Sequence, residues 1–388
     1  MMRIMRQFPA FPFTRTCRAL AYASLFLCAL SFFSNLLHPR QMDFVNFWAA
    51  GKLALSGHAA AAYDIAAHKA VQASVGATGG IMAFLYPPPM LIFAAPMALL
   101  PYTLSVGFCV TGLFILYVMM VERIWHGSRW QAAAFPPAVV NGLVGQVGLM
   151  TGTVFLAASH QLGKRPFLSG LMFGCLIIKP QLALLLPVAF LAGREWRAFG
   201  GAACSVAALL ILSWLIFGEQ PYLSMFKATP AYSAMVFDSP LAAYKMTSIY
   251  AAARFWGAGA SQAYALQMLV AAGAALAVWI IWRGPYELSA KVAMLAAATP
   301  LVSPYLFLYD AVLLISPFLW LAERRNTKGG LVVLWLLMIL HIVENWAAWP
   351  FANLMPLVPL GLVTMIWRQL KPNVVASSAR ISELPQPA

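Results

Sequence analysis

Runs of apolar residues, separated by short basic segments, recur along almost the whole chain. A helix needs about 20 apolar residues to cross a bilayer, and fewer where it is short and buried among others. The 388 residues are 62% hydrophobic and 9% charged, whereas a soluble domain is about half apolar and about a quarter charged. A soluble core could not cover this much apolar surface. The sequence therefore predicts an all-α polytopic membrane protein, in which 1–388 form a single membrane domain of about 10–12 transmembrane helices.

The expected spans follow the apolar runs. Several of them are short and contain Pro or Gly, which is tolerated where neighbouring helices or a cavity satisfy the backbone. The first run is too long for a signal peptide and lacks a cleavage site, so we expect it to be retained. The candidate spans are 18–37, 103–122, 131–142, 147–161, 166–178, 181–193, 198–217, 263–282, 288–301, 305–321, 329–343 and 354–368.

The distribution of Lys and Arg predicts the orientation. If the N-terminus is cytoplasmic, alternation of these spans places 18 of the 25 basic residues on the cytoplasmic side. Cytoplasmic loops of membrane proteins carry such an excess of positive charge. We therefore expect a multi-pass protein of the cell (inner) membrane with both termini in the cytoplasm, the C-terminal one as a tail over 372–388.

Two long connections fall on the opposite, outer side: 38–102, after the first span, and 219–262. Connections of this length within a compact fold are usually functional. Within the first, 44–55 is expected to form an amphipathic helix that ends at Ser56-Gly57, and 65–74 a second helix. Both are expected to lie in the outer membrane interface.

Composition also excludes some functions. The net charge of +14 does not indicate nucleic-acid binding, because the basic residues lie in short clusters between apolar runs instead of on one soluble face. The five cysteines are scattered without the spacing of a metal site or a disulfide framework. No metal cluster, nucleophile triad or nucleotide-binding glycine motif is present, so no metal or cofactor is expected.

Two acids begin expected outer helices, and each has two interpretations. The Asp43 carboxylate is placed to accept a proton from a hydroxyl group, but Asp is also a preferred N-cap residue. From position alone the cap interpretation is favoured for Asp43, and more strongly for Asp64.

Ionisable residues inside apolar runs are the other candidates. Lys179 interrupts a long apolar stretch, where a lysine is costly without a partner. It is suited to hold a phosphate or to extend to the headgroups. Asp310 is the only acid in its run, and a structural pairing with a Lys or Arg is an alternative to a functional role. Glu344 with His341 is interpreted as interfacial anchoring.

The order of several short motifs resembles glycosyltransferase family 87, a membrane family of the GT-C superfamily. The resemblance covers roughly 40 to 320. It is carried by Asp43-Phe44 with Trp48-Ala49-Ala50, Ser56-Gly57 with Tyr63-Asp64, Tyr86-Pro87-Pro88-Pro89, Gly145-Gln146, Lys179-Pro180-Gln181, and Ser303-Pro304-Tyr305 with Tyr309-Asp310.

This resemblance implies a GT-C-like bundle that moves a hexose, typically mannose, from a polyprenyl phosphate to a lipid- or polymer-linked acceptor on the outer face. It implies Asp43 as the catalytic base and Lys179, with Arg254 or Lys245, as the holders of the donor phosphate. The other expected cavity residues are Asp64, Tyr86, Gln146, Gln181, Ser248, Tyr305 and Asp310. The expected partners are the lipid donor, membrane lipids and a glycan or glycolipid acceptor.

Two other functions are compatible with parts of the sequence. A transporter or flippase for a lipid-linked saccharide would show inverted repeats and broken helices that meet at the membrane midplane, but no internal repeat is evident and the acids lie at the outer rim. A scaffold protein without activity would explain the outer helices but would leave Asp43, Lys179 and Asp310 without a common purpose.

Overall fold

The computed structural model describes residues 42–77, 82–237, 245–346 and 352–382, together with Arg18, Ala19, Tyr22, Ala23 and Phe26. Most of the expected first span, 18–37, and the end of the expected tail therefore lie outside the described part. Within that part the chain is helical, and its one β-type pairing is an isolated antiparallel bridge between Met246 and Phe307. The expected all-α fold is confirmed.

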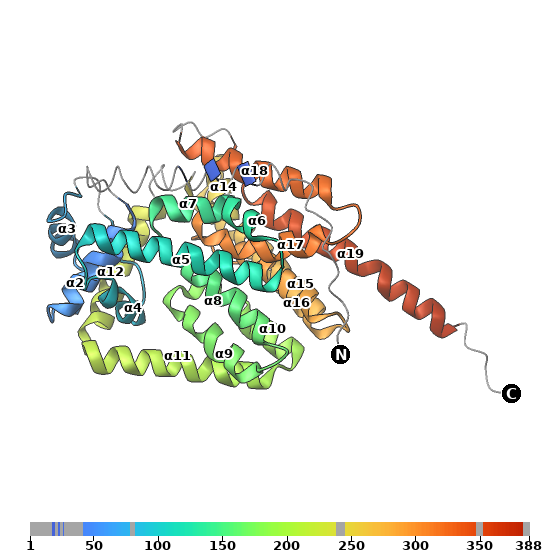
Figure 1. The fold of residues 1–388 in the computed structure, drawn as a ribbon, viewed down its shortest axis with the longest axis horizontal. Coiled ribbons are helices and arrows are strands. Elements are labelled where there is room, and N and C mark those ends of the chain that lie inside the picture. Colours follow the sequence, from blue (N-terminus) through green and yellow to red (C-terminus); the bar gives the residue numbers. More distant parts are fainter. Residues whose placement is uncertain are drawn as a thin grey trace.

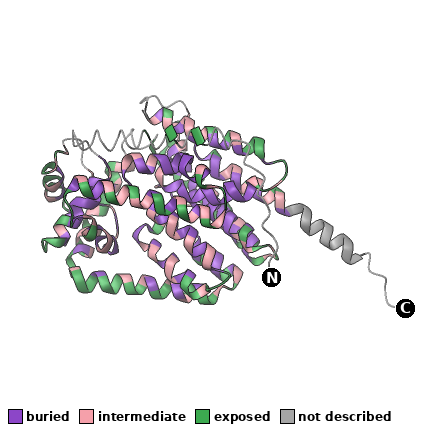
Figure 2. Ribbon diagram, viewed as in Figure 1, coloured by how far each residue is buried: buried purple, intermediate pink, exposed green. Residues whose placement is uncertain are grey.

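Four helices of the described part are long and apolar enough to cross a membrane: α5 (Tyr102–Ile124), α11 (Trp196–Phe217), α15 (Ala260–Arg283) and α18 (Lys328–Trp346). Only 17% to 33% of their most apolar stretches is buried inside the protein. Figure 2 shows α11 as largely exposed. Apolar faces of this size that remain exposed are compatible with contact with lipid tails and not with water.

Apart from the 26-residue α19 (Leu357–Ser382), the remaining helices of the bundle are shorter, because Pro and Gly divide them. Pro136 starts α7 directly after α6, Pro180 starts η3 directly after η2 and Lys179, and Pro300 lies at the change from α16 to η4. These elements are α6 (Arg129–Ala134), α7 (Pro136–Val144), α8 (Gly148–Gln161), α9 (Pro166–Gly174), η2 (Cys175–Ile178), η3 (Pro180–Leu182), α10 (Leu186–Gly193), α16 (Leu288–Ala298), η4 (Thr299–Leu301), η5 (Leu308–Leu314), α17 (Ile315–Ala322) and α19 (Leu357–Ser382).

The first long connection folds into a group of short helices that covers one end of the bundle. It contains α2 (Phe44–Leu55), η1 (Ala59–Tyr63), α3 (Ile65–Ala73) and α4 (Pro89–Met97). The second contributes α12 (Gln220–Phe237) and α14 (Ile249–Phe255). Figure 1 shows α2, α3, α4 and α12 gathered at one end of the long axis, while α19 extends from the opposite end.

The two connections also touch each other. The Tyr232 hydroxyl on α12 donates to the Tyr63 carbonyl at 3.2 Å, and both side chains are buried. Of the expected helices, 44–55 matches α2, Gly57 has a φ of +81° at its end, and 65–74 matches α3 within one residue.

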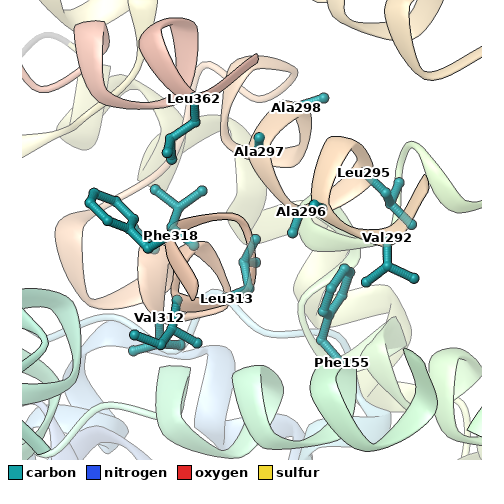
Figure 3. Close-up of a cluster of buried hydrophobic side chains, with 14 of the residues drawn as sticks. Phe155, Val292, Leu295, Ala296, Ala297, Ala298, Val312, Leu313, Phe318 and Leu362 are labelled. Atoms are coloured by element: carbon teal, nitrogen blue, oxygen red, sulfur yellow. The ribbon is translucent and has the colours of Figure 1, made fainter. Parts of the chain in front are cut away.

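The main core lies between the shorter helices. Figure 3 shows Phe155 of α8 facing Val292 and Leu295 of α16, with η5 contributing Val312 and Leu313. The three residues between Leu295 and Thr299 in this core, Ala296–Ala298, are all alanines, and all are fully buried. Small side chains allow helix backbones to approach closely, which is how packing stabilises helices in a membrane. The core therefore holds η5, and with it Tyr309 and Asp310, in a fixed place.

Candidate active site

Asp43 precedes α2 but does not cap it. Its backbone is already helical, at φ −56° and ψ −23°, and its side chain makes no hydrogen bond to the first turn. The Oδ2 atom instead accepts a hydrogen bond of 2.9 Å from Nε2 of Gln146, 103 residues away. The cap interpretation is therefore wrong for Asp43. It is correct for Asp64, whose carboxylate accepts from the Ala67 amide at 2.8 Å.

Gln146 connects Asp43 to the second half of the first outer connection. Its Oε1 accepts from the Tyr86 hydroxyl at 3.0 Å while its Nε2 donates to Asp43. Gly145, just before it, has a φ of +70°, and a Cβ there would lie 2.8 Å from that of Phe44. Only glycine fits both this backbone conformation and this close approach. The Gly145-Gln146 turn therefore places the Gln146 side-chain amide next to the Asp43 carboxylate.

Lys179 and Asp310 form a buried ion pair. Lys179 precedes Pro180, which disfavours the helical conformation at the lysine, and its φ of −142° breaks the helix there. Its ammonium group lies 5.6 Å from the Tyr86 ring centre and 5.0 Å from the Tyr309 ring centre, both cation–π contacts. Asp310 also accepts from the Phe307 amide at 3.4 Å. The Lys179 ammonium group therefore lies near two aromatic rings, and the hydrogen bond from the Phe307 amide fixes the Asp310 carboxylate with which it pairs.

Two neighbouring cavities open on these residues. The first, of about 240 Å³, is lined by Lys179, Gln181 and Asp310 and otherwise largely by apolar and aromatic side chains. The second, of about 440 Å³, exposes Asp43, Gln146 and several further polar side chains. Residues that line both are Leu85, Tyr86, Val236, Tyr305 and Tyr309. Asp43 and Lys179 thus face different cavities across one shared wall, which we call the tyrosine wall after Tyr86, Tyr305 and Tyr309.

Lys245 brings a cation to the second cavity. The chain just after it is held in place because the Thr247 amide donates to the Leu306 carbonyl at 2.8 Å, beside the Met246–Phe307 bridge. The second outer connection is in this way joined to the segment that carries Tyr305 and Asp310.

Burial raises the pKa of the Asp43 carboxyl above its ordinary value. The hydrogen bond from Gln146 and the charges of Lys179 and Lys245 act in the opposite direction. A half-buried carboxylate of raised pKa is a better proton acceptor than a fully exposed one. With one oxygen engaged by Gln146, the group can take a proton from a hydroxyl in the second cavity, while Lys179 can stabilise an anion in the first.

Not every residue expected in the site lies there. Arg254 is exposed and donates to the Ala258 carbonyl at 2.9 Å, at the end of its own helix. Ser248 caps α14 by accepting from the Ala251 amide at 3.1 Å. Asp64 is an exposed cap residue. None of the three lines either cavity. In contrast, Tyr86, Gln146, Gln181, Tyr305, Lys245 and Asp310 do.

His341 and Glu344 were assigned the wrong environment by the sequence. Interfacial anchors are partly exposed, but these side chains are 2% and 3% exposed, and His341 lines the second cavity. Together with Asn345, they are the polar residues in the last turns of an otherwise apolar α18. Their spacing of three and four residues places them on one helix face, which is the signal that could have identified them.

Comparison with known proteins gives one match. A model of glycosyltransferase family 87 matches residues 84–304, more than half of the chain. The matched region contains Tyr86, Gln146, Lys179 and Lys245, whereas Asp43, Asp310 and His341 lie outside it. No match was found among curated proteins or among solved structures.

Proposed function

The chain belongs to glycosyltransferase family 87, and from this premise we propose that it transfers a hexose, mannose in the first instance, from a polyprenyl phosphate to a glycan or glycolipid on the outer face of the cell membrane. The reaction is an inverting displacement at the anomeric carbon. The Lys179–Asp310 pair and the Asp43 carboxylate, on opposite sides of the tyrosine wall, are the observation that carries this proposal.

The first cavity is suited to the donor. A polyprenyl phosphate has an apolar chain and one anionic group, and this cavity offers apolar walls together with one ammonium group. Lys179 has three N–H donors; Asp310 accepts one, and the others remain for phosphate oxygens. Asp310 orients the ammonium group and offsets its charge while the cavity is empty. The apolar lining from α12, with Met225 and Val236, suits the first isoprene units.

The second cavity is suited to the acceptor. An acceptor hydroxyl beside Asp43 gives its proton to the carboxylate as its oxygen forms a bond to the anomeric carbon. The bond between that carbon and the phosphate oxygen breaks, and the electron pair leaves with the polyprenyl phosphate. Lys179 stabilises the charge that develops on this leaving group, a contribution that is often the largest in catalysis. Inversion requires attack and departure on opposite faces of the anomeric carbon, so in this proposal the transferred sugar lies at the boundary of the two cavities, beside the tyrosine wall.

Replacement of the base tests this mechanism. We expect Asp43→Asn to lower transfer from labelled polyprenyl-phosphate mannose by about 10²- to 10⁴-fold, because a positioned base contributes that much. Asp64→Asn is the matched control: it lies in the same connection, and Asn is an equally good cap. The rate of the unaltered protein should fall as the pH falls through the pKa of Asp43, since only the ionised carboxylate accepts a proton.

The assay uses membranes that contain the full chain and their own acceptors, with labelled polyprenyl-phosphate mannose and glucose offered in parallel. Transfer at the unaltered rate by Asp43→Asn would contradict the role of Asp43 as the base. Transfer from nucleotide sugars, but from neither lipid donor, would contradict the proposed donor class.

A further inference from the structure

The outer end of α18 forms part of the second cavity, although it lies beyond the region that the family model matches. His341, Ile342 and Asn345 line the cavity from this helix. Asp43 lines it from the position just before α2, and Gln146 lines it from the turn after α7. A single cavity thus joins the proposed base to polar groups that no motif or comparison assigns.

His341 is a buried side chain whose hydrogen-bonding capacity is largely unused within the described part of the chain. Neither of its ring nitrogens has a hydrogen-bond partner of normal geometry there, although the Lys245 backbone acts on the ring. The nearest carboxylate oxygen, Oε2 of Glu344, lies 3.8 Å from Nδ1, which is too far for a hydrogen bond. Buried polar atoms in folded proteins are nearly always paired, and leaving one unpaired is unfavourable. An imidazole on a cavity wall with unused hydrogen-bonding capacity is therefore suited to bind a ligand with hydroxyl groups.

The residues around His341 are themselves fixed in place. Oε1 of Glu344 accepts from the Ala352 amide at 3.1 Å, which holds its other oxygen toward the ring. Nδ2 of Asn345 donates to the His341 carbonyl at 2.7 Å. These contacts fix the Glu344 carboxylate beside the ring and the backbone at the end of α18, while His341 itself lines the second cavity.

The chemistry of the second cavity points to a polyhydroxylated ligand. The cavity combines carboxylate, amide, phenol, ammonium and imidazole groups, contributed by Asp43, Asn46, Gln146, Lys245, Tyr305, Tyr309, His341 and Asn345. Most of these groups can donate and accept hydrogen bonds, as sugar hydroxyls do. A neutral imidazole does both with its two nitrogens, so it can bridge one hydroxyl and a second acceptor.

We propose that His341 binds a hydroxyl of the acceptor saccharide, next to the hydroxyl that Asp43 activates, and that Glu344 is the positioning residue for its ring. The inference rests on the proposed function, because it needs the acceptor to occupy the second cavity. It assigns acceptor recognition to the end of α18 and leaves the donor to the first cavity.

Initial rates at varied donor and acceptor concentrations test the assignment. The donor is polyprenyl-phosphate mannose, and the acceptor is a dilution series of the lipid extract from membranes in which the unaltered protein transfers sugar. We expect His341→Ala to raise the KM for the acceptor about tenfold, the effect of one lost hydrogen bond, with the donor KM within about twofold. His341→Gln should recover part of the loss because its amide also donates and accepts.

His160→Gln is the matched control, since His160 lies on α8 and lines neither cavity. An unchanged acceptor KM in His341→Ala, or an equal rise in both KM values, would overturn the inference while the proposed function stood. An inactive unaltered protein would instead overturn the proposed function.

If His341→Ala does not fold, a second measurement on the unaltered protein tests the same inference. In the unaltered protein, the acceptor extract should slow the modification of His341 by diethylpyrocarbonate, followed by mass spectrometry, and should leave His160 unaffected. Equal modification of His341 with and without the extract would contradict the proposal.

Discussion

At the scale of the residue, the site depends on charges that are buried but not isolated. Lys179 and Asp310 neutralise each other inside the protein, and removal of one partner leaves the other as a costly uncompensated charge. Asp43 differs from both because its partner is a neutral amide, so its negative charge stays available for a proton. Full burial therefore gives a fixed pair on one side of the tyrosine wall, and partial burial gives a reactive carboxylate on the other.

The pair can be tested for a role beyond stability. Lys179→Met alone should lower stability, by about 3–5 kcal/mol, because Asp310 is left buried and unpaired. The double variant Lys179→Met with Asp310→Leu should recover most of that loss, since apolar replacement of a whole buried pair is often neutral. We expect transfer to remain lost in both, because neither retains a cation for the donor phosphate.

The measurement is the thermal unfolding temperature of the purified protein beside its transfer rate. Recovery of transfer together with stability in the double variant would mean that the pair is only structural.

At the scale of the element, the site is built by close approaches of backbone. Gly148 begins α8, and a Cβ at this position would lie 2.0 Å from the Tyr309 carbonyl of η5 and 2.3 Å from Nδ2 of Asn141. That same Nδ2 donates to the Tyr309 carbonyl at 3.1 Å. The start of α8 therefore sets the position of Tyr309 and, one residue later, of Asp310.

A pair of glycine substitutions separates this positioning from general helix effects. Gly148→Ala must displace the Tyr309 backbone, and we expect a loss of stability of about 1–3 kcal/mol, typical of overpacking. A fall in transfer of up to about 10²-fold should accompany it, as for small misplacements of catalytic groups. Gly112→Ala should be neutral or slightly stabilising, because Gly112 lies within α5 with no heavy atom within 4 Å of the added carbon.

The measurements are the thermal unfolding temperature and the transfer rate of the purified Gly148→Ala and Gly112→Ala variants. Full activity and stability in Gly148→Ala would mean that η5 can move away from α8 without consequence.

Sequence reasoning succeeded at this scale where the signal is local. Periodicity, Ser56-Gly57 and the Asp64 cap gave α2 and α3 nearly to the residue. It failed where the outcome depends on distant partners. The side chain of Asp43 was favoured as a cap because its partner, Gln146, lies 103 residues away. Arg254 was placed in the site although it folds back on its own helix end, and the burial of His341 depends on packing that no short motif encodes.

At the scale of the whole molecule, the loops fall into two groups. Loops expected in the cytoplasm interact with one another. Arg324 pairs with Glu287, and the charge of Lys291 opposes the rise that burial causes in the pKa of Glu195. Asp43, Lys179, Lys245 and Asp310, expected on the outer side, act on one another at the cavities. No ion pair found in the described part of the chain links the two groups. This segregation is what two faces of one membrane require.

The orientation itself can be measured with single cysteines. We expect a cysteine at Lys227 on α12 to react with a membrane-impermeant maleimide added to intact cells. One at Arg325, beside α17, should react only after permeabilisation, because positive loops remain in the cytoplasm. Both positions are first placed in a chain whose five cysteines are replaced by serine and whose transfer activity is retained. The reverse labelling pattern would overturn the proposed orientation and with it the outer-face reaction.

The tyrosine wall also limits how proteins of this design can change over evolution. Tyr86, Tyr305 and Tyr309 belong to both cavities, so a substitution that enlarges the space for one substrate also alters the space for the other. New acceptors are therefore more easily accommodated at positions that line the second cavity alone, such as Val140, Val144 and Ile342. Divergence within such a lineage should concentrate on these outer walls, while the partition between the two substrates stays nearly constant.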